Sequence, residues 1–163
     1  MLKTTLIAVC FFLFAGITSA QDAKKLSITE LETYISESDT PLIISFWATW
    51  CAPCLEEMPY LQEAAKKYAD KGVSLVLISL DSEKAFPAKI NEFIRKKGIK
   101  ASIFWLNETN ADYFCPRIDP EWSGAIPATL FVNNGLKRRN FFERQLSKEE
   151  IYEEVGKLVI GDR

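Results

Sequence analysis

The chain has 163 residues, with 20 basic and 22 acidic side chains, no histidine, and a formal charge of −2 at pH 7. Hydrophobic residues make up 48% of the sequence, which excludes a disordered protein, and the length suits one ordinary domain with a buried core. The charge balance gives no support for nucleic acid binding, because the basic cluster Lys137-Arg138-Arg139 is short and typical of a solvated strand edge.

Residues 1–20 have the pattern of a secretory signal peptide. A lysine near the start, an apolar run over 6–17 and small residues up to Ala20 are the three parts of such a signal. We therefore expect cleavage after Ala20 and an exported, periplasmic domain over 21–163. An uncleaved membrane anchor is the alternative, but the apolar run is shorter than the roughly 20 residues that span a bilayer. A lipoprotein signal at Cys10 is disfavoured, because Val9 and not a small residue stands directly before it.

The predicted helices have apolar residues at every third or fourth position, and the predicted strands are almost continuously apolar. Two of the helices begin with the capping-box spacing of serine and glutamate. In chain order the predicted elements are a helix from Ser27, strand Leu42–Trp47, helix Ala52–Asp70, strand Val73–Leu80, helix Glu83–Lys97, strand Ser102–Leu106, at most one helical turn over Asn110–Phe114, a loop over 115–127, strand Ala128–Val132, strand Lys137–Glu143 and a helix from Ser147. This alternation predicts a three-layer α/β domain with a parallel sheet and an antiparallel hairpin at its end.

The strongest chemical signal is Cys51-Ala52-Pro53-Cys54, which lies between a predicted buried strand and a predicted helix. The free N–H groups and the dipole at a helix N-terminus favour negative charge, so a thiolate at Cys51 is stabilised there. A free cysteine is about 3% ionised at pH 7, whereas one with a pKa near 7 is roughly half ionised. We therefore predict that Cys51 is the nucleophile and Cys54 the resolving thiol of a redox-active disulfide.

The cysteine pair has two alternative interpretations, a structural disulfide and half of a zinc site. A purely structural disulfide over so short a loop adds only about 2 kcal/mol to stability. Half of a zinc site needs two more cysteine or histidine ligands, and the chain has no histidine and no second Cys-x-x-Cys. Redox chemistry is favoured, and we expect neither a metal nor an organic cofactor.

The run from Trp47 to Pro59, Trp-Ala-Thr-Trp-Cys-Ala-Pro-Cys-Leu-Glu-Glu-Met-Pro, resembles the active-site segment of the thioredoxin superfamily. More narrowly, it is similar to the TlpA/ResA-like thiol–disulfide oxidoreductases of bacterial envelopes, which share the W-C-x-P-C-x-x-E-x-P pattern. Together with Ile126-Pro127, the resemblance extends over most of the chain after residue 20. It implies the thioredoxin fold, a three-layer α/β/α arrangement with a mixed central sheet.

The resemblance also implies a cis proline at Pro127, lying against the cysteine pair. A proline there has no N–H beside the sulfurs, and the backbone of Ile126 is left free to pair with an extended substrate. The alternative is an ordinary trans proline that opens a strand. We expect Trp50, Ala52, Pro53, Ile126 and Pro127 to form the substrate-binding surface.

Glu57 is the candidate acid–base group. In the resembled family a glutamate three residues after the second cysteine is thought to handle the proton of the resolving thiol. Thioredoxins have instead a buried aspartate in the preceding strand, and the matching residue here is Ser45. The alternative is a solvated helix glutamate, like its neighbour Glu56.

Three tryptophans and one further cysteine lie in or near the predicted site segments. Trp47, Trp50 and Trp122 are predicted to form apolar walls near the disulfide, with Trp50 in contact with the substrate. Packing in the core or at its rim explains each of them as well, and we favour it for Trp47 and Trp122. Cys115 is predicted to be a small buried hydrophobic residue, with a regulatory or intermolecular thiol as the alternative.

Together these features predict an exported, monomeric thiol–disulfide oxidoreductase in which Cys51 attacks a substrate disulfide and Cys54 resolves the mixed disulfide. The resemblance implies a reductase of exported proteins, with apocytochrome c as a candidate substrate and a membrane thiol reductase as electron donor. The alternative functions are a copper-binding chaperone and a thiol peroxidase. A copper-binding chaperone of this fold adds a histidine ligand, and a thiol peroxidase carries a Pro-x-x-x-Thr-x-x-Cys segment; neither feature is in the sequence.

Overall fold

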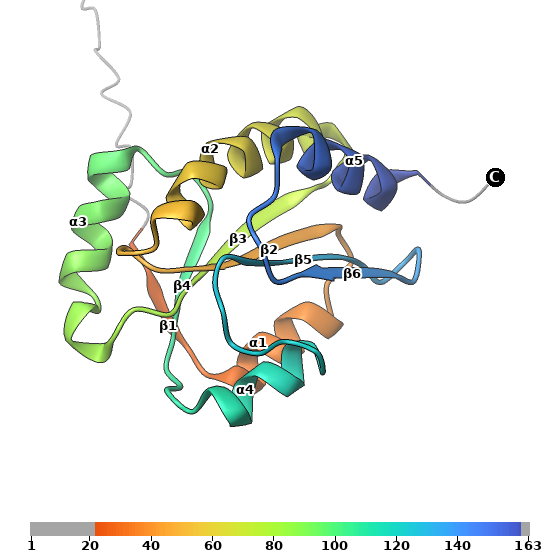
Figure 1. The fold of residues 1–163 in the computed structure, drawn as a ribbon. Coiled ribbons are helices and arrows are strands. Elements are labelled where there is room, and N and C mark those ends of the chain that lie inside the picture. The colour runs from red at the N-terminus through yellow and green to blue at the C-terminus, as the bar shows by residue number, and fades with distance from the viewer. Residues whose placement is uncertain (1–21, 161–163) are drawn as a thin grey trace, which may run out of the picture.

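A six-stranded mixed sheet forms the middle layer of the protein (Figure 1). The computed structural model describes residues 22–160, so the predicted signal peptide lies outside the described residues. The strands are β1 (Lys24–Leu26), β2 (Leu42–Trp47), β3 (Ser74–Ser79), β4 (Ser102–Leu106), β5 (Ala128–Asn133) and β6 (Arg138–Phe142). Their order is β1-β4-β3-β2-β5-β6; the first four run parallel, and β5 and β6 are antiparallel to their neighbours.

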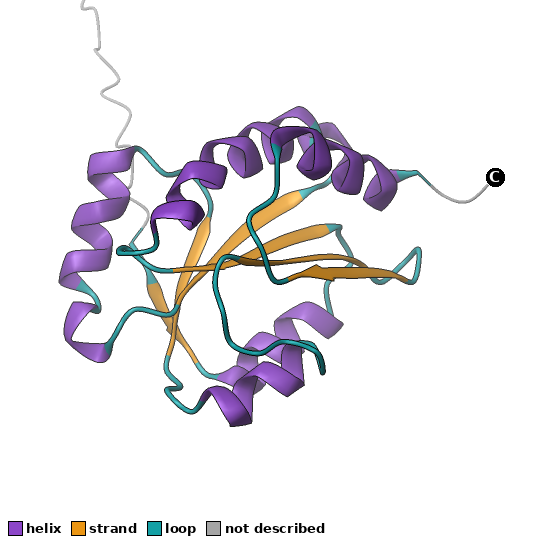
Figure 2. Cartoon of the chain, viewed as in Figure 1, coloured by secondary structure: helices purple, strands orange, loops and turns teal. Residues whose placement is uncertain are grey.

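Helices cover both faces of this sheet (Figure 2). One face carries α2 (Ala52–Lys67), α3 (Ala88–Lys97) and α5 (Lys148–Val159), and the other carries α1 (Ile28–Ser36) and α4 (Ala111–Ile118). Two short 3-10 turns, η1 (Ala69–Lys71) and η2 (Glu83–Ala85), complete the described elements. The predicted three-layer α/β/α arrangement with a mixed central sheet is confirmed.

The central strand β2 is buried on both faces, which explains why its sequence is apolar throughout. Alternate side chains point in opposite directions, so Ile43 and Trp47 join the core under α2, α3 and α5. Ile44 and Phe46 join the second core, under α1 and α4. The end of β2 is therefore held from both sides, and the turn to the cysteine pair starts from a rigid strand.

The prediction of one continuous helix over 83–97 was wrong. The chain forms η2, then an extended Phe86 with a cis bond to Pro87, and α3 starts only at Ala88. The physical reason is Pro87, because a proline disfavours the helical conformation in the residue before it.

Two further elements differ from the predictions. The helix α4 has eight residues instead of the predicted one turn, and it includes Cys115 and Pro116, for which the sequence predicts a loop. It is stabilised by an apolar face that buries Phe114, Cys115 and Ile118, so tertiary packing outweighs the cost of the internal proline. The edge strand β1 was missed, because its three residues carry no periodic pattern.

The helix starts at Ser27 and Ser147 are confirmed, since both serines make complete capping boxes. Over residues 22–160, no helix combines the length and the apolar character needed to cross a membrane.

Candidate active site

The cysteine pair lies at the N-terminus of α2, where the chain leaves β2. Cys51 is the N-cap residue of this helix and is disulfide-bonded to Cys54. The Sγ atom of Cys51 accepts a hydrogen bond from the backbone N–H of Cys54 at 3.3 Å. The helix N-terminus thus already directs an N–H group at the predicted nucleophile, and the same donor stabilises a thiolate when the disulfide is reduced. Cys51 is slightly more exposed than Cys54, at 4% against 1%.

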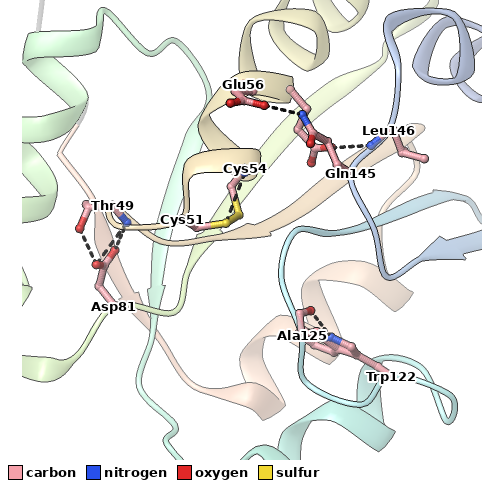
Figure 3. Close-up of a disulfide and its surroundings, with 10 residues drawn as sticks. Thr49, Cys51, Cys54, Glu56, Asp81, Trp122, Ala125, Gln145 and Leu146 are labelled. Carbon is pink, nitrogen blue, oxygen red and sulfur yellow. Dashed lines mark hydrogen bonds between the residues drawn. A yellow bond between two sulfur atoms is a disulfide. The ribbon is translucent and has the colours of Figure 1, made fainter.

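Asp81 accepts hydrogen bonds from Thr49, in the turn before the disulfide. The sequence analysis did not predict a role for this residue. Both carboxylate oxygens accept from the backbone N–H of Thr49, at 3.2 and 3.0 Å, and the Thr49 hydroxyl donates to Oδ1 at 2.6 Å. The hydroxyl of Ser79, at the end of β3, also donates to the Asp81 carboxylate. Figure 3 shows the Thr49–Asp81 pair beside the turn that carries Cys51. The only signal in the sequence was an aspartate just past a buried strand.

Asp81→Asn is expected to lower the free energy of unfolding by about 2 kcal/mol, because the amide nitrogen cannot accept from Thr49. Chemical denaturation of the oxidised protein measures this change. In a double-mutant cycle with Thr49→Val, the two losses are expected to be less than additive. Full additivity would show that the pair does not act together.

Glu57 is completely buried, so the interpretation of a solvated helix glutamate was wrong. Its Oε2 accepts from the backbone N–H of Leu146 at 2.8 Å, which ties the β6–α5 connection to α2. Its Oε1 and the hydroxyl of Thr129 are both buried without a hydrogen bond of regular geometry. Burial raises the pKa of Glu57 to about 7, and the contacts with Leu146 and Thr129 offset only part of this effect. A carboxyl group with this pKa can both take and give a proton near neutral pH.

The Ile126–Pro127 bond is cis, as predicted. The register of β2 and β5 pairs Phe46 with Ala128. Continued by one residue, it places Pro127 opposite Trp47, at the end of β2 from which the chain proceeds to Cys51. Ile126 is half-buried and packs against the cores of both faces. The sheet therefore brings the Ile126–Pro127 segment to the same edge as the cysteine pair.

The three tryptophans have different environments. Trp50, directly before Cys51, is 70% exposed, and Ala52 after it is exposed as well. Trp47 is buried in the core that also holds both cysteines. Trp122 belongs to the core of the opposite face, where its ring packs 4.5 Å from that of Phe46. Core packing is thus confirmed for Trp47 and Trp122. Pro53, the remaining predicted contact residue, is half-buried in the first turn of α2.

Cys115 is buried, as predicted, and it is a free thiol. It lies on α4 and not in a loop. Burial, with smaller contributions from the charges of Glu143 and Asp112, raises its pKa to about 11.

We expect no labelling of Cys115 by a thiol reagent at pH 8 in the oxidised native protein, and full labelling after unfolding. Mass analysis of the labelled protein, with Cys10 replaced by serine, measures this. Rapid labelling of the native protein would instead indicate a regulatory or intermolecular thiol.

Within residues 22–160, no group of three or more histidine, cysteine, aspartate or glutamate side chains is placed to hold a metal ion. The reactive groups that the structure places at the site are the sulfur pair and the carboxyl group of Glu57.

Residues 17–137 match the family model described as the AhpC/TSA family. The chain belongs to this family. Its membership of the thioredoxin superfamily, as a TlpA/ResA-like protein, is confirmed.

Two curated relatives and one solved structure illustrate the likeness. The thiol-disulfide oxidoreductase ResA of Oceanobacillus iheyensis is 32% identical over 94 residues, which cover 47% of this chain and 49% of the relative. The thioredoxin of Haemophilus influenzae is 38% identical over 104 residues, covering 64% of this chain and 85% of the relative. A thioredoxin-related protein from Neisseria meningitidis serogroup B has a TM-score of 0.62 at 23% identity, covering 76% of this chain and 87% of that chain. The chain spans about half the length of this ResA relative, and the structural likeness confirms the predicted thioredoxin fold.

Proposed function

We propose that this protein is a thiol–disulfide oxidoreductase that acts on exported protein disulfides. The observation that carries the proposal is the Cys51–Cys54 disulfide at the N-terminus of α2, with the Cys51 sulfur facing a backbone N–H donor. The name thiol-disulfide oxidoreductase, borne by the ResA relatives, agrees with it.

The reaction starts from the reduced pair. The Cys51 thiolate attacks one sulfur of the substrate disulfide, which forms a mixed disulfide and releases one substrate thiolate. The Cys54 thiolate then attacks the Cys51 sulfur and releases the second substrate thiol. Two electrons pass from the enzyme dithiol to the substrate, and the enzyme ends as the disulfide described above.

We assign Glu57 as the group that takes the proton from the Cys54 thiol in the second step. It lies on α2, one turn beyond Cys54, is completely buried, and has a pKa of about 7. A base with a pKa near the working pH is suited to this transfer. Its Oε1, which makes no hydrogen bond of regular geometry within residues 22–160, is the atom available for the proton.

We assign substrate contact to the exposed ring of Trp50, to Ala52 and Pro53 between the cysteines, and to the Ile126–Pro127 segment. Trp50 offers a large apolar surface directly beside the reacting sulfur. The backbone of Ile126 is suited to pair with an extended segment of the substrate.

Export, the direction of transfer and the partners are further parts of the proposal. The signal-like pattern of residues 1–20 supports an exported, periplasmic protein. We propose that it works as a monomeric reductase, with apocytochrome c as a candidate substrate and a membrane thiol reductase as the source of electrons.

Equilibration of the purified protein with mixtures of reduced and oxidised glutathione tests the redox activity and its direction. We expect reversible formation of the Cys51–Cys54 disulfide at a potential low enough to reduce insulin. A protein that exchanges with neither glutathione nor insulin would contradict the proposed activity.

Mass analysis after expression in a bacterium tests export, with a mature N-terminus at Gln21 as the expected result.

A further inference from the structure

The carboxylate of Glu143 accepts hydrogen bonds from the loop segment 123–125, which lies just before Ile126 and the cis proline. Its Oε1 and Oε2 both accept from the backbone N–H of Ser123, each at 3.1 Å, and Oε1 accepts from the N–H of Ala125 at 2.8 Å. The Ser123 hydroxyl also donates to Oε1. Gly124 between them has a φ of +99°, a left-handed conformation that a glycine adopts without strain. This conformation lets the two flanking N–H groups turn towards one acceptor.

Glu143 lies just past β6, at the end of the sheet beside the active site. The register of β5 and β6 pairs Thr129 with Phe142, and continued by one residue it places Glu143 opposite Ala128, next to Pro127. The loop has a second attachment, because the indole N–H of Trp122 donates to the carbonyl of Ala125 at 2.9 Å (Figure 3). The segment directly before Ile126 is thus fixed through its N–H groups and through one carbonyl.

The carboxylate is ionised in this position. Burial by itself raises the pKa of Glu143, but the hydrogen bonds from Ser123, Ala125 and Gly124 outweigh it, so the pKa lies below the ordinary glutamate value. Hydrogen bonds to an ionised acceptor are roughly twice as strong as neutral ones. The next residue along the loop, Ile126, makes no backbone hydrogen bond to any other residue within the range 22–160.

We propose that Glu143 is a positioning residue for protein substrates. It holds the N–H groups of Ser123 and Ala125, so that the backbone of Ile126 is presented, unpaired and in a fixed position, to an extended peptide that carries the disulfide. A loop that is ordered beforehand does not have to lose conformational freedom when the substrate binds. This inference rests on the proposed function and adds the residue that prepares the peptide-binding segment.

Glu143→Gln in the full chain tests the inference, because the amide keeps the size but loses the charge and one acceptor. We expect KM for a disulfide-containing peptide to rise about 5- to 10-fold with little change in kcat, from the loss of charge-assisted hydrogen bonds. Exchange with glutathione disulfide and the redox equilibrium with glutathione are expected to stay unchanged, because so small a disulfide does not pair with Ile126. Hydrogen exchange of the Ser123 and Ala125 amides is expected to become faster.

The matched control is Glu121→Gln. Glu121 lines the same surface hollow as Glu143 and is exposed, and its side chain makes no hydrogen bond to the loop. The Glu121→Gln substitution removes the same charge, so an equal rise in KM in this variant would assign the effect to general electrostatics and overturn the inference.

Ser123→Ala is the second test variant, to be used if Glu143→Gln does not fold. It removes the hydroxyl group that donates to Glu143, and the Ser123 side chain is exposed, so the substitution leaves the core intact. We expect KM for the peptide to be about twofold higher than in the wild type.

These experiments distinguish a failure of the proposed function from a failure of the role inferred for Glu143. A wild-type protein inactive with both peptide and glutathione overturns the proposed function and this inference together. An active wild type with an unchanged peptide KM in Glu143→Gln overturns only the inference. An equal loss of activity towards peptide and glutathione also overturns it, because Glu143 would then act on the reacting sulfurs.

Discussion

Replacing Cys51 with serine is expected to lower the rate of insulin disulfide reduction by about 10³-fold or more, because the attacking thiolate is lost. Cys54→Ser is expected to leave the first attack intact and to stop the reaction at the mixed disulfide. The assignment follows from position, since the Cys51 sulfur receives the N–H of the helix N-terminus, while Cys54 is the more deeply buried of the two. Turnover assays and mass analysis of the trapped adduct with a peptide disulfide measure both effects.

Cys115→Ser is the matched control, because it replaces sulfur with oxygen in the same way, at a free cysteine that lies buried on α4. Its activity is expected to equal that of the wild type. If Cys51→Ser retained wild-type activity, the proposed chemistry would be refuted. If Cys51→Ser formed the trapped adduct instead of Cys54→Ser, the two roles would be reversed.

Glu57→Gln is expected to change how stability depends on pH. The pKa of Glu57 is raised from 4.5 to about 7 in the folded protein, so between these values the folded state binds more protons than the unfolded state. The free energy of unfolding of the wild type therefore falls as pH rises from 4.5 to 7, and the loss levels off above pH 7. The shift corresponds to a total of about 3 kcal/mol. In Glu57→Gln this contribution is absent, so the variant gains stability relative to the wild type as pH rises.

The same substitution is expected to slow the resolving step by about 10²-fold at pH 7, in line with the usual effect of a general base. Rapid mixing of the reduced protein with a peptide disulfide separates the formation of the mixed disulfide from its resolution. Glu56→Gln is the matched control, because Glu56 is the neighbouring exposed glutamate on α2 and accepts a hydrogen bond from the side chain of Gln145. We expect it to alter neither the resolving rate nor the pH dependence of stability.

Equal pH–stability curves for the wild type and Glu57→Gln would show that burial does not raise the pKa of this carboxyl group. An unchanged resolving rate, with the stability effect present, would limit Glu57 to a structural role under the disulfide. Denaturant titrations of the oxidised proteins from pH 4 to pH 9 and single-turnover kinetics distinguish these cases.

Most of the fold could be predicted, because its signals are local. Apolar runs predicted the four longer inner strands, and capping boxes at Ser27 and Ser147 predicted two helix starts. Predictions failed where a proline competed with its surroundings. Pro87 divided a predicted helix, whereas Pro116 was accommodated inside α4 because the helix buries an apolar face. Local preference decided the first case and packing the second, and the sequence alone does not reveal which will win.

The candidate site divides in the same way. The cysteine pair, its position at a helix start and the proline of the second segment are contained in short stretches of sequence, so they could be identified without a structure. Asp81 and Glu143 could not, because each binds a loop that is distant in the chain, across 32 residues for Thr49 and 20 for Ser123.

The sequence by itself determined where the sulfur chemistry lies, since two cysteines after a buried strand and before a helix require no distant partner to be recognised. Only the tertiary structure decided the state of Glu57. Two adjacent glutamates on α2 look alike in the sequence, and the packing of Leu146 and Thr129 over one of them is what removes it from water. Removal from water is what raises its pKa, because a charge is costly away from solvent, and burial is a property of the assembled fold.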